Sequence, residues 1–487
     1  MPYRCLADFL DELEQAGELV RVEAAVDANL EAAEITARVA RRDGPALLFG
    51  DLTGHETPVL TNLFGRQSRI CRALGVRSPD EMAQRIALLV NPSEPEGWFE
   101  RLKTAPHVDT LSKAPPRTVK SGACQQVVRI GSDVDLNALP ILRSAPQEPM
   151  PTITAATLLG ADPDSHAQFA GRWDLQLLDA NRLAAGWADD DEPARLLAEY
   201  RGRGEKMPLA VVLGGDPAIL LAACAALPPR IDAFALAGMF REKPLDVVSC
   251  RSVDLTVPAD AEIVIEGYID PSESPVEAGS ICTPLGLYSR PRPVPVMHVL
   301  AVTQRARAIF PAMVPGAASQ EACVVTQTLG RMFLPLLKAA MVELADFDLP
   351  SYGAARHWGV ISIEKTYAGN GRRAAHAAWT MPTFRHTKVL VVIDADVDVH
   401  NTPAVLAAIA ANVRPDRDVF FEHGPPDPSD PATPPESLAH KMAIDATAKL
   451  PGEASDAWPE AAAMSEQIRQ RVDDRWDEYR IMGAERP

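Results

Sequence analysis

EIVIEGYIDPSESPVEAGSICTPLGLYS, residues 262–289, is the stretch that shows most clearly how this chain folds. Its apolar β-branched run at residues 263–265 predicts a buried strand, which Gly267 and the Asp-Pro turn after it bring to an end. The following loop is rich in Gly, Ser, Pro and Thr and carries Glu277 and Cys282. A loop tethered between strands often holds functional residues. A plain surface hairpin has the same composition, so this stretch alone leaves both interpretations open.

The composition indicates a multidomain globular protein of the reducing cytoplasm. With 487 residues the chain is too long for one ordinary core, so we expect two or three domains. A net charge of −18 without a long basic cluster argues against a nucleic-acid partner. The seven cysteines are scattered and form no Cys-x-x-Cys pair, which argues against structural zinc. We find no leader pattern and no membrane span, and we expect a cytoplasmic protein.

The first part of the chain has the pattern of an α/β domain. Residues 3–20 predict an amphipathic helix, because leucines and a phenylalanine recur at helical spacing between acidic residues. A second helix is expected over residues 30–42, and short buried strands at 46–49 and 59–63. Three prolines within residues 106–116 make this segment the best candidate for a linker to a second domain.

The central part has short apolar runs that favour a mostly antiparallel sheet or barrel. Residues 209–226 interrupt this pattern: a strand ends at Gly214-Gly215, and Asp216-Pro217 predicts the start of a helix. A Gly-Gly turn before a helix is able to hold a phosphate. Two glycines fall far short of a dinucleotide or P-loop motif, so we interpret them as a tight turn.

The last part alternates helical and strand patterns, which indicates a parallel α/β sheet. Its strand at residues 389–393 is followed by alternating acids at 394, 396 and 398 and by His400. Such residues ligate a hard cation or simply cap the end of a strand. Residues 424–436 contain six prolines and predict an extended, mobile excursion. A final helix over 465–479 has one apolar stripe suited to docking on another domain or subunit.

Seven segments, in order along almost the whole chain, resemble the UbiD family of decarboxylases. The resemblance implies an N-terminal α/β domain (1–110), a central split β-barrel of flavin-reductase type (111–305) and a C-terminal α/β domain with a long terminal helix (306–487). It also implies a homo-oligomer, either a dimer or a hexamer. The segments are NLFG (62–65), KMPLAVVLGGDPA (206–218), LPPRIDAFALAG (227–238), VPADAEIVIEGYIDP (257–271), RMFLPLLK (331–338), TKVLVVIDADVDVH (387–400) and KMAIDATAK (441–449).

Family chemistry, as this resemblance implies it, is the decarboxylation of an aromatic or α,β-unsaturated carboxylic acid with prenylated FMN as electron sink. A guanidinium holds the substrate carboxylate, and a carboxylic acid with a raised pKa returns the proton. A divalent cation and a potassium ion bind the cofactor phosphate.

The positions of the family's metal ligands carry unsuitable residues in this chain. The ligating Asn corresponds to Phe169, the ligating Glu to Ala233, and the ligating His falls among Asp189–Asp191. We therefore predict that the family's divalent metal is absent. The family's substrate-binding Arg corresponds to Asp174, and Arg172 replaces it only if the strand register shifts.

The catalytic positions are matched in part. Glu277 corresponds to the first of the family's two glutamates, and the second position holds Cys282, or Thr283 if one residue is inserted. A thiol is a weaker acid than a tuned carboxyl group. We predict Glu277 and Cys282 as catalytic residues. The residues predicted to contact the cofactor are Thr154, Pro228 and Lys388.

Two functions follow from the resemblance. The first is an active carboxy-lyase with a rearranged site. The second is a non-catalytic UbiD-like paralogue that serves as a subunit or scaffold of a carboxylase or decarboxylase assembly. A third arrangement, FMN or another cofactor bound without metal, also remains open, because fold alone does not decide function.

Overall fold

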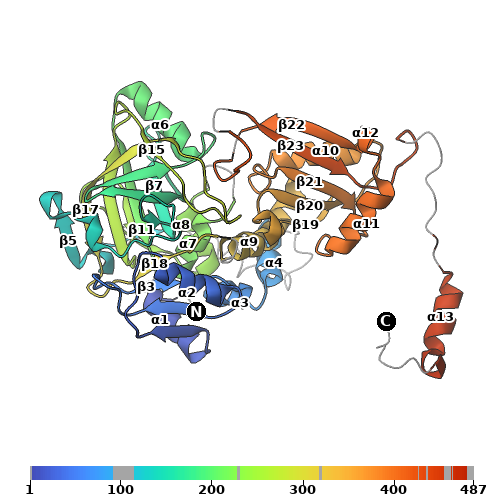
Figure 1. Ribbon diagram of the computed structural model, residues 1–487, viewed down its shortest axis with the longest axis horizontal. Coiled ribbons are helices and arrows are strands. Elements are labelled where there is room, and N and C mark those ends of the chain that lie inside the picture. The colour runs from blue at the N-terminus through green and yellow to red at the C-terminus, as the bar shows by residue number, and fades with distance from the viewer. Residues whose placement is uncertain are drawn as a thin grey trace, which may run out of the picture.

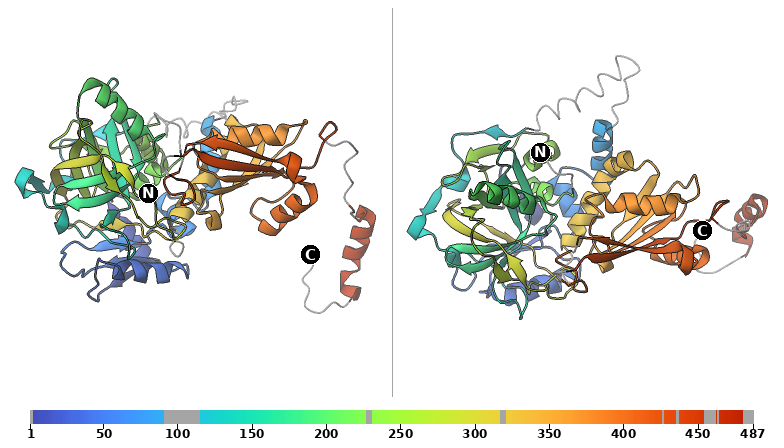
Figure 2. Two further views of the ribbon diagram at one scale, coloured as in Figure 1. Left: turned by 45° about the horizontal axis from the view of Figure 1, so that its top comes forward. Right: turned by 90° about the horizontal axis from the view of Figure 1, so that it is seen from above.

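The computed structural model arranges the chain as three sheet-containing parts, with one helix standing apart near the C-terminus (Figures 1 and 2). The long helix α9 (Glu321–Ala340) lies between the central and C-terminal parts in Figure 1. The structure describes residues 3–90, 115–226, 231–316, 321–425, 427–434, 437–453, 462 and 464–479.

The N-terminal sheet has four strands in the order β1-β2-β3-β18. Strand β18 pairs in parallel with β3, so the chain returns to this sheet after it has formed the central part. We predicted one helix over residues 3–20, which is wrong: the left-handed backbone of Gly17, at φ +70°, separates a helix from a strand. The elements are α1 (Leu6–Gln15), β1 (Leu19–Val22), α2 (Glu31–Ala40), β2 (Ala46–Phe49), β3 (Val59–Thr61), α3 (Gln67–Ala73), α4 (Pro79–Val90) and β18 (Phe310–Ala312).

The central part is built on a nine-stranded sheet whose path runs β6-β9-β10-β17-β14-β11-β7-β8, with β5 paired to β17. All its pairings are antiparallel, which confirms the sheet predicted from the short apolar runs. The strands are β5 (Val127–Ile130), β6 (Thr152–Ile153), β7 (Ala156–Ala161), β8 (Gln168–Arg172), β9 (Asp174–Asp179), β10 (Arg182–Gly186), β11 (Met207–Leu213), β14 (Ile263–Ile269) and β17 (Val296–Gln304).

Strand β14, from the stretch quoted first, lies inside this sheet between β11 and β17. Successive side chains of a strand point to opposite faces. Ile263 and Ile265 accordingly join the large central core, while Val264 joins a second core on the other face. Both faces of the sheet are therefore covered, which explains why this strand is apolar at consecutive positions.

Helices and two small sheets cover the central sheet. The turn at Gly214-Gly215 has positive φ at both residues, and the carboxylate of Asp216 accepts the Ala218 N–H, which confirms the predicted tight turn and helix cap. The covering elements are β4 (Arg117–Thr118), α6 (Glu192–Arg203), α7 (Pro217–Ala223), α8 (Ala233–Arg241), β12 (Asp246–Ser249), β13 (Thr256–Pro258), β15 (Val276–Ala278) and β16 (Arg292–Val294).

The C-terminal sheet has the order β19-β20-β21-β23-β22. Its middle strands β20, β21 and β23 are parallel, as predicted, whereas the edge strands β19 and β22 are antiparallel to their neighbours. The elements after α9 are β19 (Leu344–Asp348), β20 (Trp358–Ile363), α10 (Asn370–Trp379), β21 (Val389–Asp394), α11 (Thr402–Asn412), α12 (Pro415–Asp418), β22 (Val419–Gly424), β23 (Ala439–Asp445) and α13 (Glu466–Asp474).

Two expectations about the chain's organisation keep the status of predictions. The boundary near 306 falls between β17 and β18, and the boundary near 110 lies outside the described residues, as does most of the predicted linker. Of the proline-rich segment 424–436 the structure describes residues 424–425 and 427–434. This described part differs from the predicted mobile excursion, because Asp427 and Asp430 are buried. Among the helices that the structure describes, none is long and apolar enough to cross a membrane.

Candidate functional site

Thr154, one of the predicted cofactor contacts, lies against an arginine at the end of β8. Arg172 Nε donates to the Thr154 carbonyl oxygen at 2.9 Å, and Nη2 contacts Asp174 Oδ1 at 2.8 Å. We considered Arg172 and Asp174 as members of one strand, but Trp173 separates β8 from β9, so they belong to different strands. The two side chains still meet in an ion pair.

This ion pair is partly enclosed, with side-chain exposures of 25% for Arg172 and 34% for Asp174. Burial raises the pKa of Asp174, against the opposing charges of Arg172 and Arg356. Burial alone would lower the pKa of Arg172, but its interactions with Asp174, Cys224 and Glu321 outweigh this and raise it. A guanidinium has five N–H donors, and those not used by Thr154 and Asp174 have no partner among the described residues. Arg172 can therefore accept a further anionic group.

A second carboxyl group, which the sequence interpretation missed, shares this environment. Glu321 begins α9, is only 1% exposed, and accepts the Phe64 N–H at 2.7 Å through Oε1. Its Oε2 is buried and has no hydrogen-bond partner in the described part of the chain. Burial raises the pKa of Glu321 to about 7, although the bond from Phe64 and the charges of Arg69 and Arg172 oppose the rise. At neutral pH this group can give or take a proton.

Cys224, at the end of α7, completes what we call the Arg172 cluster: Arg172, Asp174, Cys224 and Glu321. Burial raises the pKa of the Cys224 thiol to about 11, with the charge of Arg172 acting against the rise. The thiol is therefore protonated at neutral pH and is a poor nucleophile. The groups of the cluster that can take part in chemistry are therefore the Arg172 guanidinium and the carboxyl groups of Asp174 and Glu321.

The loop that carries the two predicted catalytic residues is held against β9 and a buried acid. Gln176 of β9 bonds both backbone groups of Gly279, at 2.8 and 3.1 Å. Glu148 Oε1 accepts the Cys282 N–H at 2.9 Å. Burial, followed by the charge of Glu148, raises the pKa of the Cys282 thiol to about 11. Glu277 lies on β15 with an exposed side chain, so it lacks the enclosed surroundings that raise the pKa of Glu321.

The positions corresponding to the family's metal ligands offer no ligand set in this structure. The Phe169 ring fills the space left by Gly160, where a Cβ would lie 2.4 Å from it, and Ala233 is buried in α8. Asp191 accepts the Trp173 indole N–H at 2.8 Å and also pairs with Arg385. Across the described ranges, no group of three or more His, Cys, Asp or Glu side chains is arranged to hold a metal ion. These residues do not fit the divalent cation.

Lys388 lies on the opposite side of the junction between the central and C-terminal parts. Its ammonium group contacts Asp430 Oδ1 at 2.9 Å. Nearby, Arg385 reaches across to Asp191 and Asp190 of the central part. The charge of Arg356 also acts on Asp174, so the C-terminal part faces the Arg172 cluster. Thr154 and Lys388 thus lie on the two sides of this junction, whereas Pro228 lies outside the described residues.

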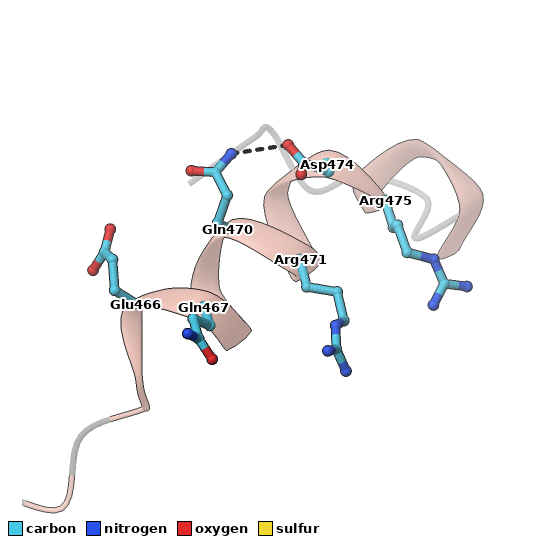
Figure 3. Close-up of a pocket in the computed structure, with 6 residues that line it drawn as sticks. All are labelled: Glu466, Gln467, Gln470, Arg471, Asp474 and Arg475. Atoms are coloured by element: carbon cyan, nitrogen blue, oxygen red, sulfur yellow. Dashed lines mark hydrogen bonds between the residues drawn. The ribbon is translucent and has the colours of Figure 1, made fainter.

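A separate hollow of about 600 Å³ runs along α13 (Figure 3). Its lining consists of charged and amide side chains, among which Gln470 donates to Asp474 at 2.8 Å. No described residue of α13 is buried. The hollow is far from the junction in Figure 1 and has no arrangement of groups for catalysis, and the docking of this helix on another subunit stays a prediction.

Comparison with known proteins settles the family. Three models for 3-octaprenyl-4-hydroxybenzoate carboxy-lyase match the chain: the N-terminal domain at residues 10–89, the Rift-related domain at 117–318 and the C-terminal domain at 323–446. The chain belongs to the UbiD family. An uncharacterized protein of Aquifex aeolicus (strain VF5) is 36% identical over 482 residues, covering 98% of this chain and 99% of that protein.

Solved structures of UbiD-class proteins have the same fold. The UbiD-class enzyme HmfF from Pelotomaculum thermopropionicum, in complex with FMN, has a TM-score of 0.75 at 28% identity and covers 96% of this chain and 98% of its own. An evolved dimeric form of HmfF with prenylated FMN has a TM-score of 0.73 at 27% identity, with coverage of 97% and 100%. The vanillic acid decarboxylase of Sedimentibacter hydroxybenzoicus, in closed form, has a TM-score of 0.86 at 24% identity, with coverage of 99% and 100%.

Proposed function

We propose that this UbiD-family protein is a decarboxylase that acts on an aromatic or α,β-unsaturated carboxylic acid with prenylated FMN. The observation that carries the proposal is the Arg172 cluster. In this cluster a guanidinium with unused donors interacts electrostatically with a buried carboxyl group, Glu321, whose pKa is raised to about 7. The FMN and prenylated-FMN complexes of HmfF support the choice of cofactor. The substrate class comes from the resemblance to the family.

Arg172 is the group that would bind the substrate carboxylate. Guanidinium and carboxylate groups pair through two parallel hydrogen bonds, which fixes both position and orientation. Asp174 already occupies one donor of Arg172. Substrate must therefore share the guanidinium with Asp174 or displace it. Burial raises the pKa of Asp174, which weakens its hold on the guanidinium relative to a solvated carboxylate.

Glu321 is the group that would return the proton. In decarboxylation the bond to the carboxyl carbon breaks, carbon dioxide leaves, and a proton takes up the electron pair that remains. A carboxyl group with a pKa near the working pH is well suited to this transfer. When bound, prenylated FMN supplies the electron sink for this bond cleavage. Thr154 and Lys388 would hold it, and the orphaned Oε2 of Glu321 fits the presence of a polar ligand.

The non-catalytic paralogue is the second candidate, and three observations favour it. Asp174 places an internal carboxylate on Arg172, and Glu277 is exposed instead of enclosed. The positions of the family's metal ligands also hold residues that do not fit a divalent cation. We therefore route no step of the reaction through a metal.

The two candidates are separated by loading the protein with cofactor. The protein is coexpressed with a prenylated-FMN synthase and purified anaerobically, its absorbance spectrum is recorded, and carbon dioxide release is measured with a panel of aromatic and acrylic acids. We expect a bound flavin and turnover of at least one acid. A flavin-free spectrum without carbon dioxide release would retire the enzyme proposal and leave the paralogue.

Substitutions then test whether Arg172 binds the substrate carboxylate and whether Glu321 donates the proton. Arg172→Gln and Glu321→Gln are each expected to lower decarboxylation by roughly two to four orders of magnitude, the usual effect of losing a positioned catalytic group. Glu364→Gln is the matched control, because Glu364 is an exposed carboxyl group directly after β20. If Glu277→Gln abolishes turnover and Glu321→Gln does not, the proton donor is the residue predicted from the sequence, and our assignment of Glu321 is wrong.

A further inference from the structure

A proline-rich segment of the C-terminal part contacts the central part and carries a buried carboxylate. We call its residues 427–434 the strap. It follows β22 and lies between the central part and the C-terminal sheet in Figure 1. Arg290 of the central part donates to the Pro431 carbonyl oxygen at 3.1 Å through Nη2. The side chain of Asp427, only 6% exposed, is turned into the protein, and Ser429 fixes its Oδ1 through two hydrogen bonds, at 2.9 and 2.8 Å.

The surroundings of Asp427 are cationic. Arg356 Nε lies 2.6 Å from Oδ2, an ion contact without hydrogen-bond alignment, and His357 Nδ1 lies 3.9 Å from the same oxygen. Burial alone would raise the pKa of Asp427. The charge of Arg356 and the interactions with His386 and His357 outweigh burial, and they hold this pKa far below its usual value. Asp427 therefore occupies its place as an anion.

The groups around Asp427 have unused hydrogen-bonding capacity. Nδ1 of His357 and both ring nitrogens of His386 are buried without a hydrogen-bond partner among the residues that the structure describes. Both rings line a cavity of about 10 Å³ next to Asp427, which has room for no more than one water molecule. Buried polar groups are nearly always paired in native proteins, so unpaired imidazole nitrogens in a cationic pocket indicate a missing partner.

Asp427 offsets part of an excess of positive charge around the strap. Six arginine and lysine side chains face five carboxylates, and without Asp427 the cations would exceed the carboxylates by six to four. An uncompensated positive charge in a partly buried place is unfavourable unless another anion enters. The cations are Arg290, Arg292, Arg356, Arg385, Lys388 and Lys441, and the carboxylates are Asp189, Asp190, Asp191, Asp427 and Asp430.

We propose that the pocket around Arg356, His357 and His386 is a binding site for the carboxylate or phosphate group of a ligand, and that Asp427 of the strap fills it in the free protein. A ligand anion takes the place of the Asp427 carboxylate, contacts the Arg356 guanidinium, and supplies partners for the two imidazoles. The strap then leaves the pocket. Lys388, a proposed cofactor contact, also lines this pocket. The anion site is therefore tested without flavin and without turnover, so that its failure and that of the proposed decarboxylation are distinguishable.

The first test compares affinities for two simple anions. Inorganic phosphate and, separately, benzoate are titrated calorimetrically into wild type, Asp427→Asn and Asp416→Asn at constant ionic strength, since free salt screens such contacts. Asp416 is an exposed carboxylate of α12 and serves as the matched control. If Asp427 fills the pocket in nine molecules out of ten, Asp427→Asn should bind about tenfold more tightly than wild type. Adding Arg356→Gln to the Asp427→Asn variant should remove this gain in anion affinity. Equal affinities of wild type and Asp427→Asn would overturn the proposal.

A second test uses only the wild-type protein, in case Asp427→Asn does not fold. Hydrogen–deuterium exchange is followed by mass spectrometry with and without each anion. An anion that enters the pocket should speed exchange in the peptide of the strap and leave α11 unchanged. Faster exchange with phosphate but not with benzoate identifies a phosphate site, and the reverse identifies a carboxylate site. No change with either anion would refute the displacement of the strap.

Discussion

Replacing Glu321 by Gln is expected to remove a large part of the pH dependence of this protein's stability. Folding raises the pKa of this carboxyl group from 4.5 to about 7, chiefly through burial. Between these values the folded protein binds more protons at this site than the unfolded chain does. The slope of stability against pH is therefore negative, and stability falls as the pH rises through this window. Glutamine stays neutral throughout and so resembles the protonated form.

The expected difference in stability follows from the size of the pKa shift of Glu321. The difference between about 7 and 4.5 is about 2.5 pH units, and at about 1.36 kcal/mol per unit this corresponds to roughly 3 kcal/mol. Glu321 is only 1% exposed, so solvent screening does not reduce this figure much. The amide oxygen of Gln can still accept the Phe64 N–H. We thus expect wild type and Glu321→Gln to be similarly stable near pH 4.5 and to differ by about 3 kcal/mol near pH 8, with the variant more stable.

The assay is urea denaturation of both proteins at several pH values from 5 to 8, with Glu364→Gln as the exposed control. Glu262 and Asp216 also have raised pKa values, about 7 and about 6, but both are present in wild type and variant alike. The difference between the two profiles therefore isolates Glu321. Parallel profiles would show that Glu321 is ionised across this range. The residue would then be unable to donate the proton in the proposed reaction.

Three further substitutions or modifications test packing, the contact between the parts, and thiol reactivity. Phe169→Ala should lower the free energy of unfolding in urea by roughly 3 to 5 kcal/mol, because the ring is buried against Trp173 and its removal leaves a cavity. A decrease below about 1 kcal/mol would mean that the ring is not packed. Arg385→Gln removes the contact with Asp191 between the central and C-terminal parts, and small-angle scattering should show a larger radius of gyration than that of wild type. Cys224, with its pKa raised to about 11, should react with iodoacetamide at pH 7.5 at least tenfold more slowly than in the urea-unfolded protein, as followed by mass spectrometry.

The strands and helix caps could be predicted where local chemistry determines them. Ala46–Phe49 is a strand with the predicted bounds, because four consecutive apolar residues are buried on both faces. Asp216 caps its helix because a short side-chain acceptor and a following proline suit the first turn. The helix predicted over residues 3–20 was too long, since amphipathic spacing outweighed the single glycine at position 17 in that interpretation. The structure shows that this glycine ends the helix.

The proline-rich strap shows why composition alone misjudges a segment. Six prolines within residues 424–436 exclude regular structure, and from this we predicted a mobile excursion. Proline, however, also reduces the freedom of the unfolded chain and leaves less entropy to lose on folding. A segment of this kind can pack when its few polar side chains find strong partners. Asp427 and Asp430 find them in Arg356 and Lys388, which lie far away in the sequence.

The candidate site was only partly visible in the sequence because its chemistry arises from burial. Glu277 could be found from a motif, yet the structure leaves it exposed, and a motif does not state whether water surrounds a side chain. Glu321 lies outside the segments that resemble the family, and its hydrogen-bond partner Phe64 is 257 residues away. The same carboxyl group on a solvated helix would be an ordinary N-terminal charge with its usual pKa. Only the packing of the N-terminal sheet, α7 and β8 around it excludes water. A proton donor for this chain is therefore better sought among its buried carboxyl groups than among those that match the family by position.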